Sequence, residues 1–309
     1  MRKSSAFRVG ALGLGMGFLY LPILVLVLGS FNASSDAVAW GGWSTRWYAQ
    51  LRGDALLREA AMVSVRLALA AASAATLVGT LAALALARLG PFRGKAVFGV
   101  ALYAPLVMPE IVIGLSLLVL FAAFITERGF WTAAIAHTAM TTGLVAIVVQ
   151  ARLVALGQSL DEAAMDLGAS PLGAFAAITL PLLLPAIAAG WLAAFALSFG
   201  DLVIASFTTG ASAITLPMRV FAEARLGIRP QLDALCTVMM AVGGIAVMAA
   251  VLLFGSGAAT FKKKRIDAKG RRRLMERISA TGAAKASPGP RAAESQDFLY
   301  DDDGLPRSE

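Results

Sequence analysis

Six long apolar stretches, separated by shorter polar segments, set the pattern of this chain. They cover about residues 9–31, 61–87, 96–124, 131–151, 178–200 and 232–256. Each provides the roughly 20 mostly apolar residues that a helix needs to cross a bilayer. The pattern predicts an all-α fold, a polytopic membrane bundle of six transmembrane helices within residues 1–260.

Composition supports an integral membrane protein. Of the 309 residues, 58% are hydrophobic and 15% are charged, a balance outside the range of ordinary soluble domains. The single cysteine, Cys236, has no second cysteine to pair with, and the single histidine, His137, lacks a cluster of other metal ligands in the sequence. We therefore expect no metal site and interpret His137 as a packed or hydrogen-bonded helix residue.

Basic residues indicate the orientation of the bundle. They gather before the first span, between the second and third spans, and after the last span, where the positive-inside bias favours the cytoplasm. The residues are Arg2, Lys3 and Arg8, then Arg88, Arg93 and Lys95, then the run KKKRIDAKGRRR. Both termini are therefore predicted to be cytoplasmic, and by alternation so is the loop near residues 160–170.

The first span, the aromatic segment that follows it and the C-terminal residues each have a distinct pattern. The apolar core of the first span is longer than the 7–15 residues or so of a signal peptide, which favours a retained anchor over cleavage near Ala39. Trp40, Trp43, Trp47 and Tyr48 follow it and predict an interfacial helix that Ser44 caps. Residues 261–309 are predicted to be a cytoplasmic tail, first basic and facing anionic lipid, then disordered, with no nucleic-acid partner.

An acidic segment, DEAAMDLGASP, interrupts the apolar pattern before the fifth span. Asp161, Glu162 and Asp166 suit a short helix, and Gly168 can take the left-handed conformation that ends it. Ser170 and Pro171 then suit the N-cap and first position of a new helix. The segment predicts a protruding elbow for docking another protein, and the alternative is a solvated loop without a role.

The spacing of this segment favours docking. Glu162-Ala163-Ala164 is followed after three residues by Gly168, and after nine more by Ile178 and Leu180-Pro181. This pattern resembles the EAA loop of bacterial ABC importer permeases, which implies the type I importer fold, the inner membrane and a coupling helix at about 160–170. The resemblance implies that Glu162, Ala163, Ala164, Asp166 and Gly168 couple the chain to a separate ATPase.

The chain itself is not expected to hydrolyse ATP. The segment Gly90–Lys95 is one residue short of a phosphate-binding loop and lacks the following Ser or Thr. The resemblance places ATP and magnesium on two copies of a cytoplasmic ATPase, and adds a homologous second permease and a periplasmic binding protein as partners. We predict no cofactor in this chain.

Two acidic residues lie within or beside spans. Glu110 follows Pro109 in the third span, and Asp201 lies near the outer end of the fifth. Because an ionisable group in a membrane is costly and is a functional candidate by default, both are candidates for a cation pathway. The alternative for each is an internal salt bridge or a capped carboxylate.

Further stretches narrow the resemblance. The segments APLVMPEIVIGLSLLVLF and SFGDLVIASFTTGASAITLPMRVF resemble the second permease of spermidine/putrescine importers, most closely of the putrescine type. Transport of ferric iron, sulfate or another small solute is the alternative, followed by a secondary transporter, which would not need the elbow. A membrane enzyme would need a catalytic cluster that the single His and Cys do not supply. An assembly protein would not be expected to associate with partners in a nucleotide-sensitive way.

Overall fold

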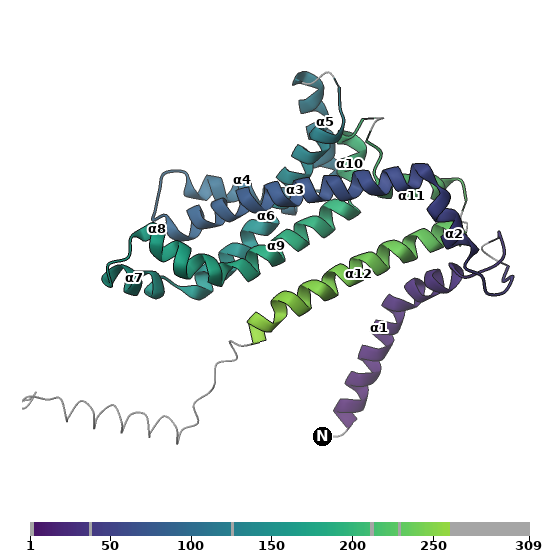
Figure 1. Cartoon of the computed structure of the whole chain (residues 1–309), viewed down its shortest axis with the longest axis horizontal. Helices are drawn as coiled ribbons and strands as arrows, with labels where there is room; N and C mark the ends of the chain where they lie inside the picture. Colours follow the sequence, from purple (N-terminus) through teal and green to yellow (C-terminus); the bar gives the residue numbers. More distant parts are fainter. Residues whose placement is uncertain (1–2, 37–38, 125–126, 211–212, 228–229, 260–309) are drawn as a thin grey trace, which may run out of the picture. The chain divides into compact units, whose positions relative to one another are not determined.

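The computed structural model describes residues 3–36, 39–124, 127–210, 213–227 and 230–259. In these ranges every regular element is helical, and one isolated bridge joins Asn32 and Trp43. The elements are α1 (Lys3–Gly29), α2 (Arg46–Gly53), α3 (Ala55–Arg88), α4 (Lys95–Val107), α5 (Glu110–Phe124), α6 (Phe130–Leu156), α7 (Ser159–Asp166), α8 (Pro171–Ala174), the π-helix η1 (Phe175–Thr179), α9 (Leu180–Gly200), α10 (Val203–Thr208), α11 (Leu216–Arg225) and α12 (Pro230–Ala259) (Figure 1).

The predicted all-α membrane bundle is confirmed. Among the described residues, four segments are long and apolar enough to cross a bilayer: Gly10–Gly29, Ala55–Arg88, Phe130–Leu156 and Pro171–Gly200. Helices α4 and α5 meet the same criterion only when taken together as a bent pair, and the apolar helix Pro230–Ile245 lies where the sixth span was predicted. The predicted tail, residues 261–309, lies outside the described residues.

The third span differs from the single helix predicted over residues 96–124. It is broken after Val107, and the chain direction bends by 112° between α4 and α5. Pro109 has no N–H to donate and disfavours helical geometry at the preceding residue. Met108 accordingly has extended dihedrals, φ −76° and ψ 143°.

Helices α3, α6 and α9 form the core of the bundle. Their contact surface is built largely from alanine and valine, and it includes Ala72, Ala75, Ala83, Val145, Ala146, Val149, Leu153, Leu183 and Ala194. Lipid tails are as apolar as these side chains, so close packing rather than hydrophobic transfer holds the helices together. Small residues serve this purpose because they let helices approach closely.

Two glycines show how close the helices come. A Cβ at Gly79 of α3 would lie 2.8 Å from the Thr142 carbonyl oxygen of α6, and a Cβ at Gly143 of α6 would lie 2.5 Å from the Leu102 carbonyl oxygen of α4. Both distances are below any normal contact. Alanine at either position would therefore push the helices apart.

The segment between α1 and α3 corrects two predictions. Thr45, not Ser44, is the N-cap residue of α2, and the Ser44 hydroxyl instead accepts from the Arg46 N–H at 3.2 Å. Trp40 and Trp43 are exposed as expected of interfacial residues. Trp47 is buried, however, and its Nε1–H donates to the Asn32 carbonyl at 2.7 Å.

Candidate functional site

The segment from Ser159 to Ala174, which we call the elbow, has the predicted local structure. Helix α7 ends at Asp166, and Gly168 adopts φ +91°. The Gly168 N–H donates to the Met165 carbonyl at 2.9 Å, and the Ala169 N–H donates to the Ala164 carbonyl at 3.0 Å. These bonds satisfy carbonyls at the helix end, the usual role of a left-handed glycine.

The second half of the elbow starts a new helical segment. Ser170 is extended, and its hydroxyl accepts from the Gly173 N–H at 3.1 Å, while Pro171 occupies the first turn of α8. The predicted N-cap and first position are therefore confirmed. The helix then widens into η1 before Leu180 and Pro181 begin α9, a π-segment of the kind often found at functional sites.

The elbow presents both charge and apolar surface. Glu162, Ala163, Asp166 and Gly168 are exposed and Ala164 is half-buried. Leu167 and Leu172 are 90% and 79% exposed, which sequence reasoning missed because leucine blends into the surrounding apolar pattern. Exposed apolar patches rimmed by polar residues mark sites of interaction with a protein or a membrane.

The opposite side of the elbow is attached to the bundle. A carboxylate oxygen of Asp161 lies 3.1 Å from an Arg88 guanidinium nitrogen at the end of α3, and the other accepts a hydrogen bond from the Thr179 hydroxyl in η1. The side chains of Asp161 and Arg88 are each 20% exposed. Sequence reasoning recorded both charges but had no signal that would pair them.

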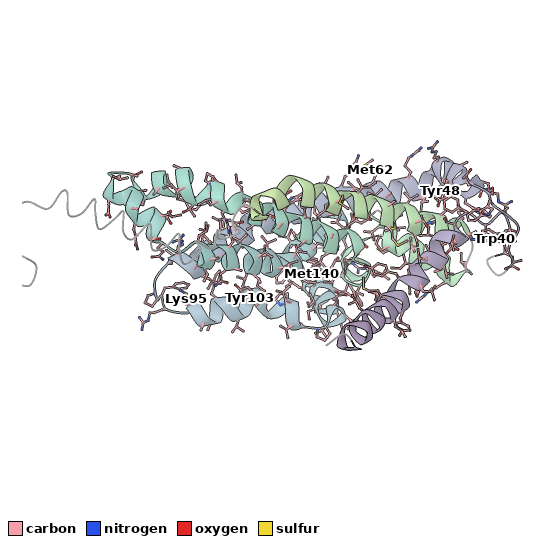
Figure 2. All side chains as sticks on the ribbon, turned by 90° about the horizontal axis from the view of Figure 1, so that it is seen from below. Trp40, Tyr48, Met62, Lys95, Tyr103 and Met140 are labelled. Atoms are coloured by element: carbon pink, nitrogen blue, oxygen red, sulfur yellow. The ribbon has the colours of Figure 1, made fainter. Side chains whose placement is uncertain are left out.

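The elbow and the basic loop between α3 and α4 therefore lie at the same end of the bundle. Figure 1 shows α7 and α8 at one end and α11 at the other. Figure 2 shows Lys95 toward one end and the aromatic residues Trp40 and Tyr48 toward the opposite end. This separation of basic and aromatic residues matches the two faces expected from the sequence.

Glu110 lies at the break in the third span. It is the first residue of α5, directly after Pro109, and it is exposed. A carboxylate at a helix N-terminus is favoured by the helix dipole, and interrupted helices are where membrane transporters place their binding groups. No hydrogen bond or ion pair joins Glu110 to Asp201 in the described part of the chain.

Asp201, by contrast, is enclosed. Its side chain is 2% exposed. One oxygen accepts from the Ile204 N–H at 3.3 Å, and the other accepts from the Ala205 N–H at 2.7 Å. The latter oxygen also lies 3.4 Å from His137 Nε2. This is the geometry of the capped carboxylate, the alternative considered for this residue.

His137 completes this buried group. It is fully buried on α6, and its Nδ1 is 2.8 Å from the Ser198 hydroxyl on α9. The group thus links α6, α9 and the start of α10. No set of three or more His, Cys, Asp or Glu side chains able to hold a metal ion occurs among the described residues.

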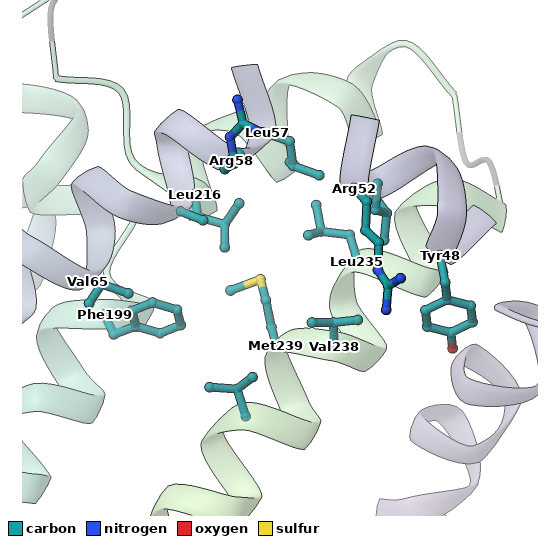
Figure 3. Close-up of a pocket in the computed structure, with 13 residues that line it drawn as sticks. Tyr48, Arg52, Leu57, Arg58, Val65, Phe199, Leu216, Leu235, Val238 and Met239 are labelled. Carbon is teal, nitrogen blue, oxygen red and sulfur yellow. The ribbon is translucent and has the colours of Figure 1, made fainter. Parts of the chain in front are cut away.

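An apolar pocket lies away from both acids. It has a volume of about 590 Å³ and is lined mainly by hydrocarbon from α2, α3, α9 and α12 (Figure 3). Its charged lining residues are Arg52 and Arg58, and neither Glu110 nor Asp201 takes part. A pocket with this lining does not suit a cationic solute.

Comparison with solved structures defines the class of the fold. A chain of a bacterial ABC transporter involved in the import of the acidic polysaccharide alginate superimposes with a TM-score of 0.62 at 14% identity, covering 84% of this chain and 96% of that chain. The fold is therefore that of an ABC transporter membrane subunit.

The family follows from the sequence matches. Residues 75–266 match the family described as binding-protein-dependent transport system inner membrane component, and the chain belongs to this family. It is 48% identical to the putrescine transport system permease protein PotI of Escherichia coli K12, over 78% of this chain and 88% of that protein. It is 38% identical to the spermidine/putrescine permease PotC of the same strain, over 76% and 89%. The predicted resemblance to polyamine permeases is confirmed.

Proposed function

We propose that this chain is the permease subunit of an ATP-driven importer that moves polyamines, putrescine or spermidine, into the cytoplasm. The match to a putrescine permease over most of both chains carries the proposal. An inner-membrane chain with a fully filled EAA pattern supports the same mechanism. Ferric iron or sulfate transport remains the competing proposal, and the test below separates them.

The proposed complex contains four kinds of subunit. A second, homologous permease forms a heterodimer with this chain, two ATPase copies lie at the cytoplasmic end, and a periplasmic binding protein delivers the solute. ATP and magnesium bind to the ATPases, and both termini of this chain lie in the cytoplasm. The basic loop beside the elbow supports that orientation.

The elbow is proposed to dock onto the ATPase. Leu167 and Leu172 supply exposed apolar surface, and Glu162 supplies a carboxylate suited to an arginine. Ala163 and Ala164 leave the backbone of α7 approachable, while Asp166 and Gly168 complete the end of the helix. This arrangement gives the charged segment a role in an otherwise apolar chain.

Glu110 is proposed to face the solute route. Its negative charge suits the ammonium groups of a polyamine, and the break after Val107 opens the helix at that point. Asp201 was the second candidate, but its carboxylate already caps α10 and is enclosed. We therefore propose a structural role for Asp201.

Uptake by the reconstituted complex tests the proposal. Proteoliposomes containing both permeases and the ATPase are supplied with binding protein, ATP and labelled putrescine or spermidine, with ferric iron and sulfate as competitors. ATP-dependent uptake that only polyamines compete supports the function. If iron or sulfate competes with uptake, the transport of that solute would replace polyamine transport as the function. Failure of this chain to co-purify with any ATPase would exclude an ATP-driven importer.

Two elbow variants test the docking surface. Glu162→Ala removes the carboxylate that is proposed to pair with an arginine of the ATPase. Gly168→Val forces a branched side chain into the left-handed region, at a cost of about 1–2 kcal/mol. Both should insert normally yet reduce ATPase co-purification and uptake. Gly99→Ala is the control, because that glycine has open space around it and no positive φ. Wild-type uptake by both elbow variants would contradict the docking role.

A further inference from the structure

A single carboxylate connects the elbow to two parts of the bundle. Asp161 of α7 pairs with Arg88 at the last residue of α3 and accepts from Thr179 at the last residue of η1. We propose that Asp161 is the positioning residue through which movement of the elbow enters the membrane helices. This inference rests on the proposed importer function and specifies how the elbow transmits force.

The position of Asp161 on α7 separates it from the docking surface. Glu162, Ala163 and Asp166 are exposed on the same short helix, whereas Asp161 is largely covered and holds its two partners. One side of α7 is thus open to a protein partner while the other is fastened to the bundle. The contacts of Asp161 give a push on the open side a direct route to α3 and η1.

Both partners of Asp161 belong to elements that lead into the core. Helix α3 packs along α6 and α9 through the alanine-rich surface described above. Thr179 is 3% exposed and directly precedes Leu180 and Pro181 at the start of α9. The carboxylate therefore contacts α3 and the segment that leads into α9, the two helices that form the core with α6.

The geometry gives this link more strength than an isolated surface ion pair. Isolated exposed ion pairs contribute about 0–1 kcal/mol, partly because both side chains lose conformational freedom in holding one geometry. Here the two oxygens have different partners, and each side chain of the ion pair is only 20% exposed. The η1 segment beside it has a wide helical turn, a feature frequently found at functional sites.

The experiment uses the complete importer in proteoliposomes and measures both uptake and ATP hydrolysis. Asp161→Asn and Arg88→Gln each remove the ion pair, and Thr179→Val removes the hydrogen bond. We expect the ATPase to co-purify as with wild type, while uptake per ATP hydrolysed falls about 2- to 30-fold, the range expected for residues that couple sites. Thr179→Val should give the smaller decrease.

Two further variants separate a link from a merely structural contact. Arg93→Gln removes a positive charge from the same loop and should leave coupling unchanged, because the side chain is exposed and makes no ion pair with α7 among the described residues. The exchange Asp161→Arg with Arg88→Asp should restore part of the lost coupling, because the opposite charges again face each other.

Three results would overturn the inference. The first is unchanged uptake per ATP in Asp161→Asn and Arg88→Gln, and the second is no recovery of coupling in the exchanged pair. The third is loss of the ATPase from the Asp161→Asn complex, because Asp161 would then be a docking residue. Failure of the proposed function has a different signature, since the wild-type chain would then lack polyamine uptake or an ATPase partner.

Discussion

Glu110 and Asp201 are both acids at the ends of apolar helices, Glu110 at the start of α5 and Asp201 directly after α9, yet their surroundings are opposite. Asp201 has a 2% exposed side chain, two backbone donors and a histidine. Glu110 is exposed at the break of the third span. The difference shows that burial and existing hydrogen bonds, rather than position in the sequence, separate the two acids.

Asp201→Ala should produce the largest effect, because it removes the acceptor for the Ile204 and Ala205 N–H groups. Each buried donor left without a partner costs about 1–3 kcal/mol, so the two together give about 2–6 kcal/mol. Thermal unfolding of the purified chain in detergent measures this loss. Glu110→Ala is the matched control and should unfold within about 0.5 kcal/mol of wild type, as exposed substitutions usually do.

Asp201→Asn refines the same test, since its amide retains one oxygen as an acceptor. Its loss of stability should lie between those of wild type and Asp201→Ala. If Asp201→Ala unfolds like wild type but abolishes polyamine uptake, the comparison is reversed, and Asp201 belongs to the route after all.

Glu110→Gln should change transport and leave stability intact. A hydrogen bond to a charged group contributes about 1.5–3 kcal/mol, so losing the charge should reduce uptake about tenfold or more. Initial uptake rates of labelled putrescine in proteoliposomes provide the measurement. Glu110→Asp keeps the charge and should retain more uptake than Glu110→Gln; equal rates for wild type and Glu110→Gln would remove Glu110 from the route.

Ser198→Ala should give the smallest effect and test how far the buried group extends. It deletes the hydroxyl that lies 2.8 Å from His137 Nδ1, and a typical intramolecular hydrogen bond contributes about 1 kcal/mol. The unfolding midpoint should therefore fall less than for Asp201→Ala. A loss as large as that of Asp201→Ala would mean that the serine, rather than the aspartate, organises the group.

Local features of the fold were predictable from the sequence because their signals are local. The spans follow from apolar length, and the elbow follows from Gly168, Ser170 and Pro171, whose conformations depend on a few neighbouring residues. Pro109 indicated a weakened helix. The 112° angle at that point was not predictable, because packing around the break determines it.

Contacts between distant segments account for what the sequence did not show. Arg88 and Asp161 come from different helices, and so do His137 and Asp201. Nothing in the order of residues indicates which charges meet, since that depends on how α3, α6 and α9 pack. For the same reason the enclosure of Asp201 and the exposure of Leu167 emerged only in three dimensions.

The π-helix η1 also affects how this region tolerates changes in chain length. In a regular α-helix, deleting one residue turns everything beyond it by about 100°, because each residue advances the helix by 1/3.6 of a turn. A π-turn holds one extra residue, so a deletion within Phe175–Thr179 can be absorbed by narrowing that turn. The coding sequence can thus lose one codon there without rotating α7 and α8 about the helix axis relative to α9.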